Sequence, residues 1–169
     1  GATLDGVEGS DIVLLRESYV TGNTANKNVG SNLPVTLSGL TLRGPDAANY
    51  SAQGGTVTVN VVPRNLYVYS NRTSETDRTY DGTTDATLNV YLSNQYNSDD
   101  LVLAWTDMSF ADKNVARNSA GNVTSKTITV SGITVTGADV GNYALQNTSI
   151  TNSGTIRPVE LVVSGITTT

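Results

Sequence analysis

One phrase occurs twice in this chain. Residues 35–50 read Val-Thr-Leu-Ser-Gly-Leu-Thr-Leu-Arg-Gly-Pro-Asp-Ala-Ala-Asn-Tyr, and residues 128–143 read Ile-Thr-Val-Ser-Gly-Ile-Thr-Val-Thr-Gly-Ala-Asp-Val-Gly-Asn-Tyr. Internal repetition constrains a fold more than any other sequence signal, because it predicts an array of one structural unit. The copies lie about 90 residues apart, beyond the roughly 20–50 residues of solenoid repeats, so each unit can hold a small core of its own.

The repeat sets the expected domain boundaries. Residues 1–65 form a first repeat, residues 66–160 form a second and complete repeat, and residues 161–169 begin a third. The alignment places Ala2–Leu4 opposite Ala86–Leu88 and Asp11 opposite Asp100.

The opening segment of the second repeat has no upstream copy. Leu66–Tyr69 and Thr79–Thr84 have no counterpart before residue 2, whereas Leu161–Val163 restarts the first of these segments. The first repeat is therefore expected to lack its opening strand, and the chain is expected to be a piece of a longer polypeptide.

Composition restricts the fold class and the partners. The 169 residues are 37% hydrophobic and 15% charged, which favours two small cores over one large core. Thr, Ser, Asn and Gly are abundant and favour short strands joined by turns. The net charge of −5 argues against nucleic acid or an anionic membrane surface as a partner.

Two residue types are missing altogether. The chain has no His and no Cys, so it lacks the usual general base, the commonest metal ligand and any thiolate nucleophile. An enzyme would have to rely on carboxylates, Lys or Tyr, as a carboxylate-dependent glycoside hydrolase does, but two small units leave little room for its cleft, and we expect no enzymatic activity. No apolar run approaches about 18 residues, so we expect no membrane insertion.

Strict alternation of apolar and polar residues predicts half-buried antiparallel strands at Thr56–Val62 and Lys126–Ser131. Single helical turns are predicted at 45–48 and 138–141. Short strands separated by turn signals are typical of a β-sandwich. Further strands are predicted at 12–16, 66–70, 86–92, 101–106, 143–146 and 159–164.

The alternation changes phase within the repeated phrase. Ile128 and Val130 share one phase, whereas Ile133 takes the other, and Gly132 lies at the change. Gly39 occupies the same place in the first copy. A glycine there suits a β-bulge or a strand that crosses between sheets, and a plain Ser-Gly turn would give the same pattern.

The end of the phrase resembles a tyrosine corner. Asp46–Tyr50 and Asp139–Tyr143 follow the Asp-x-Ala/Gly-x-Tyr pattern of immunoglobulin-like sandwiches, in which the tyrosine hydroxyl binds the upstream backbone. We therefore predict an all-β chain of tandem immunoglobulin-like β-sandwich modules, with Tyr50 and Tyr143 as structural residues. The alternative is β-grasp-like modules with a short helix.

Four ordered motifs of the second repeat resemble a known family. They are Thr79–Leu88 (Thr-Tyr-Asp-Gly-Thr-Thr-Asp-Ala-Thr-Leu), Phe110–Val115 (Phe-Ala-Asp-Lys-Asn-Val), Val130–Leu145 and Thr155–Pro158. Together they look like the YDG-type repeat, related to MBG-type repeats, of large secreted bacterial adhesins of the filamentous-haemagglutinin-like, two-partner secretion class. The first repeat departs further, because its opening motif is absent and Asn26–Val29 lacks the Phe-Ala-Asp lead.

The resemblance implies a structural stalk repeat of a secreted or surface-attached adhesin, which holds an adhesive region away from the cell for host attachment or biofilm formation. It implies an extracellular location, neighbouring repeats of the same polypeptide as partners, and no catalytic residue. The alternative is a repeat that itself binds a glycan or a matrix protein.

Two lysines could form crosslinks. Lys27 and Lys113 occupy matching places, each before an asparagine, and an isopeptide bond would require a buried lysine beside an amide or carboxyl group with a neighbouring acid. The simpler interpretation is a solvated turn lysine.

Several acidic residues could bind calcium, because calcium prefers carboxylate oxygens. No acidic loop motif of the Asp-x-Asp-x-Asp-Gly kind is present, and acidic loop residues in water explain the pattern equally simply. No other cofactor is expected. The candidate ligands are Asp99 and Asp100 with Asp5, Asp11 or Asp107.

Trp105 with Tyr69, Tyr91 and Tyr96 could form an aromatic platform for a sugar ring. However, alternation over 101–106 places Trp105 on the same face as two leucines. We therefore predict that Trp105 is the core tryptophan of the second repeat.

Overall fold

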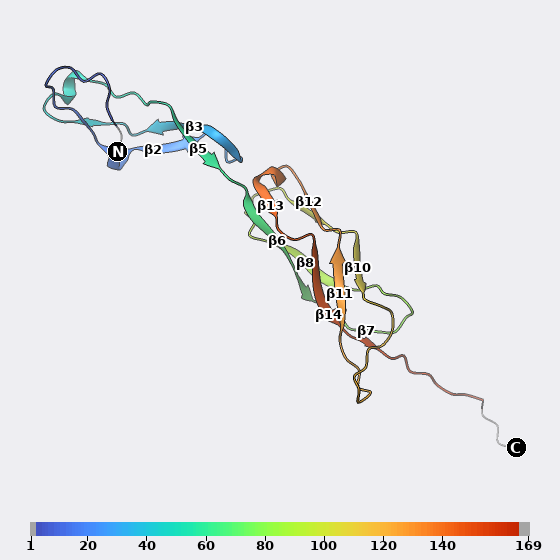
Figure 1. Cartoon of the computed structure of the whole chain (residues 1–169). Coiled ribbons are helices and arrows are strands. Elements are labelled where there is room, and N and C mark those ends of the chain that lie inside the picture. Colours follow the sequence, from blue (N-terminus) through green and yellow to red (C-terminus); the bar gives the residue numbers. More distant parts are fainter. Residues whose placement is uncertain (1–2, 166–169) are drawn as a thin grey trace. The chain divides into compact units, whose positions relative to one another are not determined.

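The computed structural model describes residues 3–165 of the chain. The chain divides into two compact units, Gly1–Pro63 and Arg64–Thr169, here called unit 1 and unit 2. Unit 1 spans the blue to green part of the ribbon in Figure 1, and unit 2 spans the green to red part. Residues 1–2, at the beginning of the expected first repeat, and residues 166–169, within the expected start of a third repeat, lie outside the described residues.

The prediction of an all-β chain is confirmed. Regular structure within residues 3–165 consists of short strands and three 3-10 turns, η1 (Glu17–Tyr19), η2 (Ala47–Asn49) and η3 (Val140–Asn142), with no α-helix among the described residues. The last two turns lie where single helical turns were predicted. None of the helices in the described part of the chain has the length and apolar character needed to cross a membrane.

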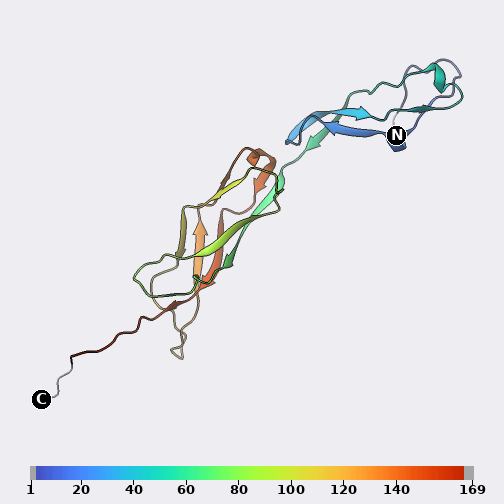
Figure 2. The ribbon, with the colours of Figure 1, turned by 180° about the vertical axis from the view of Figure 1, so that it is seen from behind.

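Unit 2 is built from two three-stranded sheets, visible from opposite sides in Figures 1 and 2. In the first sheet β6 lies between β8, which is antiparallel to it, and β13, which is parallel to it. In the second sheet β11 pairs antiparallel with both neighbours. The strands are β13 (Tyr143–Leu145), β6 (Arg64–Arg72) and β8 (Leu88–Ser93), then β10 (Asp107–Phe110), β11 (Lys126–Ser131) and β14 (Ser149–Gly154).

Two short ladders complete unit 2. The strands β9 (Val102–Ala104) and β12 (Thr134–Thr136) pair antiparallel, and β7 (Arg78–Thr79) pairs parallel with β15 (Ile156–Arg157). The parallel pair lies close to the end of the unit and anchors its last strand.

Both sheets of unit 2 contribute to one apolar core. Along β6 the alternation buries Leu66 and Val68 and leaves Tyr67 and Tyr69 exposed, as period-2 patterning requires. The buried cluster comprises Val68, Leu88, Phe110, Ile128, Val130, Ile133 and Ile156. Because these residues come from both sheets, unit 2 is a two-layered structure.

Side-chain amides join the two sheets where the chain passes from β13 to β14. Asn147 accepts a hydrogen bond from the backbone N–H of Val68 (2.9 Å) and donates one to its carbonyl (2.8 Å). Asn152 donates to the carbonyl of Ser70 (3.1 Å). The amides thus take the place of backbone pairing where the strand leaves the first sheet.

Unit 1 contains one three-stranded sheet and one short ladder. The sheet has the order β2-β3-β5 and is antiparallel throughout. In the repeat it corresponds to the β10-β11-β14 sheet of unit 2. The strands are β2 (Thr21–Thr24), β3 (Gly30–Ser38) and β5 (Val57–Val61), and the ladder joins β1 (Leu14–Leu15) to β4 (Leu42–Arg43).

Burial in unit 1 is weaker than the alternation predicted. Val57 and Val59 were expected to face a core, yet each is 42% exposed. Among the residues of 3–63 whose side chains the structure describes, Val13 is the one buried apolar residue, at 8% exposure. The alternation correctly placed a strand, but the described residues of unit 1 form no second three-stranded sheet to cover that face.

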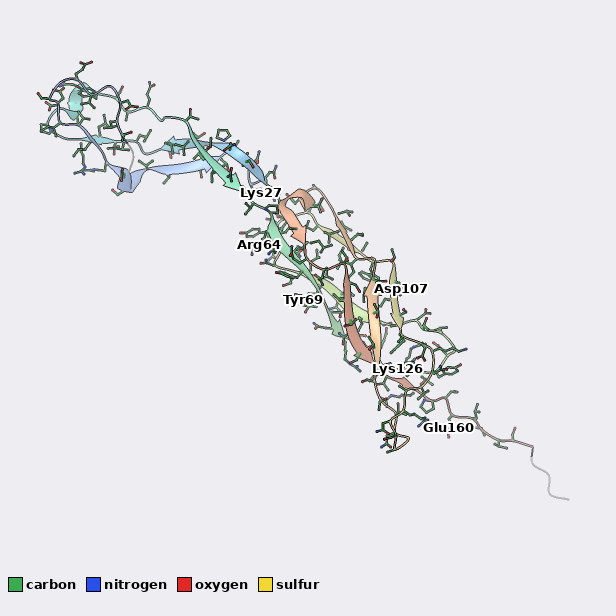
Figure 3. All side chains as sticks on the ribbon, in the orientation of Figure 1. Lys27, Arg64, Tyr69, Asp107, Lys126 and Glu160 are labelled. Carbon is green, nitrogen blue, oxygen red and sulfur yellow. The ribbon has the colours of Figure 1, made fainter. Side chains whose placement is uncertain are left out.

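The strand predicted at 159–164 is wrong for the described structure. The segment is extended but carries no strand pairing, and Leu161 is 84% exposed. Its apolar alternation has no neighbouring strand on which to pack. Figure 3 shows Glu160 on this single C-terminal segment.

Candidate functional site

A network of polar contacts in unit 2 surrounds Tyr143. Its hydroxyl donates a hydrogen bond to the carboxylate of Asp99 (2.6 Å) and accepts one from the backbone N–H of Tyr96 (3.1 Å). Tyr143 directly follows η3, whose C-cap fixes an extended backbone at this residue. The network therefore ties the start of β13 to the loop between β8 and β9.

Unit 1 repeats this network. The hydroxyl of Tyr50 donates to the carboxylate of Asp11 (2.7 Å) and accepts from the backbone N–H of Glu8 (3.1 Å). The geometry makes Asp11 equivalent to Asp99 and not to Asp100, so the sequence alignment was wrong by one position here. Similarity of the neighbouring apolar residues had favoured the other register.

The network differs from the tyrosine corner of immunoglobulin domains. In that corner the hydroxyl binds backbone a few residues upstream. Here the backbone donors lie 42 residues before Tyr50 and 47 residues before Tyr143. The bond thus joins distant segments of a unit, and we call each network a tyrosine clasp: Tyr50, Asp11 and Glu8 in unit 1, and Tyr143, Asp99 and Tyr96 in unit 2.

Each clasp is extended by the aspartate that begins the short helical turn. The carboxylate of Asp139 accepts a hydrogen bond from the backbone N–H of Asp100 (2.9 Å). In unit 1 the carboxylate of Asp46 accepts one from Ile12 (2.8 Å). The aspartates thus hold the segment that carries the clasp acceptor.

Two glycines that were not among the predicted site residues allow the repeated phrase to lie close to the backbone of Ile12 or Asp100. Gly137 and Gly44 have φ values of 121° and 125°, and a Cβ atom at either position would overlap the carbonyl oxygen of Asp100 or Ile12. Only glycine combines this backbone conformation with this space. Its recurrence two residues before the aspartate in both copies of the phrase is the signal that could have identified it.

The clasp shifts the pKa of both tyrosines upward. Burial raises the pKa of Tyr143, and the hydrogen bond to Asp99 raises it further, against the opposing effect of the Tyr96 N–H. For Tyr50 the backbone bond from Glu8 lowers the pKa, but the bond to Asp11 together with burial outweighs it. Both hydroxyls are therefore held in the neutral form.

The Tyr-Asp-Gly motif forms a tight turn in unit 2. The carboxylate of Asp81 accepts hydrogen bonds from the Thr83 N–H (2.9 Å) and hydroxyl (3.0 Å), and Gly82 has a φ of 87°. Tyr80 packs against the core cluster. The Thr83 N–H and the ion pair with Arg78 hold the pKa of Asp81 at about 2.

Arg78 connects this turn to the Phe-Ala-Asp motif. Its guanidinium donates to the Thr83 carbonyl (2.7 Å) and lies over the ring of Phe110, 5.5 Å from the centroid. The backbone N–H of Phe110 donates to the Thr84 carbonyl (2.7 Å). Two of the motifs that define the second repeat are therefore in direct contact with each other.

The two glycines at the phase change lie in left-handed backbone, with φ of 73° at Gly39 and 64° at Gly132. In unit 2 the ladders on either side of Gly132 keep one register, since Asp107 pairs with Ser131 and Ala104 with Thr134. No extra residue is present, so Gly132 is a kink where the chain passes from one ladder to the next, and not a β-bulge.

The prediction for Trp105 is wrong. Its side chain is 40% exposed and does not belong to the core cluster. The strand β9 ends at Ala104, so the alternation of Leu101 and Leu103 does not continue to Trp105. Phe110 and Ile133 are buried in its place.

The lysines proposed for crosslinks do not meet the requirement for burial. Lys27 and Lys113 are both exposed. The buried lysine is Lys126, whose side chain is 8% exposed and forms an ion pair with Asp112. It also donates to the carbonyl of Asn114 (2.9 Å), so it fixes the loop that contains Lys113.

The acidic residues do not form a metal site among the described residues, where no group of three or more His, Cys, Asp or Glu side chains could hold an ion. Asp11 and Asp99 accept the clasp hydroxyls, and Asp100 accepts from the Ala138 N–H (3.2 Å). Asp107 accepts from the hydroxyl of Ser109 (2.8 Å).

Three tyrosines form an exposed row on the outer face of β6 and β8. The ring centroids of Tyr67 and Tyr69 lie 6.4 Å apart, and those of Tyr69 and Tyr91 lie 6.2 Å apart. Figure 3 marks Tyr69 on β6. The remaining candidate, Tyr96, instead lies 4.6 Å from the guanidinium carbon of Arg64. Tyr67 was not among the predicted candidates, although it shares the outward phase of Tyr69 on β6, and this shared phase is the signal that could have identified it.

Comparison with known proteins identifies the family. No curated protein and no solved structure matches the chain. The family model described as the YDG domain matches residues 1–58 and 62–151, in two consecutive segments. These segments cover most of both units and include the Tyr-Asp-Gly turn and both tyrosine clasps, and the chain therefore belongs to the YDG domain family.

Proposed function

We propose that the chain is a structural spacer repeat of a secreted or surface-attached bacterial adhesin of the filamentous-haemagglutinin-like, two-partner secretion class. In this role it holds an adhesive region away from the cell and performs no catalysis. Its partners are neighbouring repeats of the same polypeptide, and it acts outside the cell.

One observation carries this proposal: two consecutive units contain the same clasp with the same donors and acceptors. A spacer needs units that are each held together by their own bonds. The tyrosine clasp, the Asp46 or Asp139 contact and the glycine before it meet this need in both units.

We also infer that the complete repeat is an immunoglobulin-like sandwich. Two three-stranded sheets share one core, and the chain crosses between them at Asn147. These features favour the sandwich over the β-grasp alternative, which requires a helix on one sheet.

The spacer role is tested by replacing the chain within the polypeptide that contains it. Deleting residues 1–169 is expected to reduce adhesion of intact cells, and an unrelated rigid β-domain spacer of equal length is expected to restore it. Antibody against the chain should label intact cells. If only the native sequence restores adhesion, the chain acts as a binding module and the spacer proposal is wrong.

A second function is favoured by the tyrosine row. Exposed aromatic rings on one sheet face can stack on sugar rings, and Tyr67, Tyr69 and Tyr91 are 37%, 50% and 38% exposed. A glycan array probed with the chain tests this. Loss of binding in Tyr69→Ala, with binding kept in Tyr96→Ala, an exposed tyrosine outside the row, would support a binding module over a spacer.

A further inference from the structure

The outer face of the first sheet of unit 2 carries a strip of exposed aromatic and amide side chains along β6 and β8. Tyr69 lies opposite Tyr91, and Asn71 lies opposite Asn89. Because outward residues recur at every second position, the rings lie in the middle of the strip and amides lie at both ends. We call it the aromatic-amide strip, and it comprises Asn65, Tyr67, Tyr69 and Asn71 on β6 with Asn89 and Tyr91 on β8.

The polar groups of this strip have no partner within the described part of the chain. Among residues 3–165, the side-chain amides of Asn65, Asn71 and Asn89 and the hydroxyls of the three tyrosines make no hydrogen bond. Elsewhere in unit 2 such groups are engaged, as in the tyrosine clasp and at Asn147, which bonds to the backbone of Val68. The fold therefore does not account for the three amides that flank the tyrosine row.

The aromatic-amide strip carries no charge. The strand β8 has no charged residue, and the two charged residues of β6, Arg64 and Arg72, lie at its ends in the phase of the buried residues. Both are engaged, since Arg64 donates to the side chain of Asn94 (2.7 Å) and Arg72 forms an ion pair with Asp77. An anionic ligand would find no cation on this face, and the net charge of −5 would repel it. The strip therefore suits an uncharged ligand.

The chemistry of the strip matches that of a sugar chain. Aromatic rings offer apolar faces to the C–H faces of sugar rings, and each amide offers both donors and an acceptor to sugar hydroxyls. Exposed tyrosines also serve protein interfaces, but free amides at both ends of the rings favour a ligand rich in hydroxyl groups. Because the strip lies on an open sheet face, it contacts a chain from the side, which favours the internal units of a linear polysaccharide over chain ends.

We propose that the aromatic-amide strip binds the internal units of a neutral linear polysaccharide. The chain of sugars lies along β6 and β8, with its rings stacked on the tyrosine row. The amides of Asn71 and Asn89 bond to sugar hydroxyls at one end of the row, and the amide of Asn65 does so at the other. This inference rests on the second function proposed above, for which it names the ligand class and three further binding residues.

Affinity gel electrophoresis of the purified chain tests the ligand class. Soluble linear β-glucan, mannan and xylan serve as neutral probes, and alginate and hyaluronan serve as acidic probes. We expect at least one neutral probe to retard the chain and neither acidic probe to do so. Immobilised collagen serves as a protein probe, and we expect the chain not to bind it.

Substitutions on the strip test its residues. Tyr69→Ala removes the central ring and should weaken binding to the neutral probe about tenfold, whereas Tyr69→Phe keeps the ring and should bind within about threefold of the parent chain. The double variant Asn71→Ala, Asn89→Ala should weaken binding about three- to tenfold, because hydrogen bonds to the sugar are lost. Asn122→Ala, which changes an exposed asparagine before β11, is the matched control and should bind like the parent. Trp105 fluorescence during denaturation checks that each variant folds.

The possible failures of this inference can be told apart from failure of the second function. Weaker binding in Tyr69→Ala with no effect of the double variant overturns the role of the amides and leaves the tyrosine row as a glycan site. Preference for an acidic probe or for collagen overturns the ligand class. If no probe retards the chain, both this inference and the second function are wrong, and the spacer role stands.

Discussion

Ile128 and Val130 are fully buried in unit 2, whereas Val35 and Leu37, their counterparts in the repeated phrase, are only half-buried in unit 1. The backbone pairing is the same in both places, since Val35 pairs with Thr24 as Ile128 pairs with Phe110. Unit 1 thus has the strand but neither the aromatic neighbour nor the second sheet that would cover it.

The tyrosine clasps, unlike the burial of the apolar residues, are nearly the same in the two units. Tyr50 and Tyr143 have the same kinds of partner at nearly the same distances, although the surrounding burial differs. The comparison teaches that the phrase specifies its polar network locally, through a glycine, an aspartate and a short helical turn. Burial of its apolar residues depends on strands elsewhere in the repeat.

The largest expected difference between the two units is in the stability lost when an apolar side chain of the repeated phrase is shortened. Ile133, at 2% exposure, and the half-buried Leu40 occupy matching positions. Ile133→Ala should destabilise unit 2 by about 3 kcal/mol because it leaves a cavity, and Leu40→Ala should cost unit 1 at most about half as much. Trp105 fluorescence during denaturation reports unit 2, and hydrogen exchange of β3 amides reports unit 1. Equal losses of stability in the two units would contradict the conclusion that burial makes Ile133 more important than Leu40.

Removing the hydroxyl of the tyrosine clasp should destabilise both units, with a smaller difference between them. Tyr143→Phe removes the hydroxyl that binds Asp99 and should cost unit 2 about 1 kcal/mol, and Tyr50→Phe should also destabilise unit 1. The raised pKa adds a pH test. Stability from the neutral hydroxyl is complete below the unfolded pKa, near 10, and is lost as the pH rises through the higher folded pKa.

Urea midpoints of unit 2 should therefore fall above about pH 10, and Tyr143→Phe should flatten that fall. Tyr69→Phe, which removes an exposed hydroxyl from the tyrosine row, is the control and should keep the parent profile. A Tyr143→Phe profile that falls as steeply as the parent would exclude the clasp as the cause.

The smallest expected effect comes from the Tyr-Asp-Gly turn. The pKa of Asp81 is lowered from 3.8 to about 2 by the Thr83 N–H and Arg78. Its contribution is present above pH 3.8 and is lost as the pH falls toward the folded value. Asp81→Asn should therefore flatten the acid loss of unit 2 stability, measured by Trp105 fluorescence, and Glu75→Gln should not. Hydrogen exchange of unit 1 should not change with Asp81→Asn.

Local patterns predicted the local structure well. The strand Lys126–Ser131 has the bounds that its alternation indicated, and the single helical turns lie within two residues of their predicted positions. These features depend on interactions between near neighbours, which a short stretch of sequence contains.

Errors arose where distant segments decide the outcome. Trp105 is exposed because β9 ends one residue earlier, where the chain pairs with Thr134. Lys126 and not Lys113 is the buried lysine because β11 carries it beneath the Asp112 loop. Val57 and Val59 alternate like buried residues, but alternation within one strand cannot indicate whether another sheet will cover it.

The parallel pairing of β6 with β13 also bears on how unit 2 folds. The strand that opens the unit pairs with β8 but finds its parallel partner β13 only much later in the chain, and the bonds between Val68 and Asn147 span 79 residues. Loop closure over that distance must be completed before the contacts can compensate for it, so high contact order predicts slow folding. Unit 2 therefore cannot complete its first sheet before residues 143–147 are available.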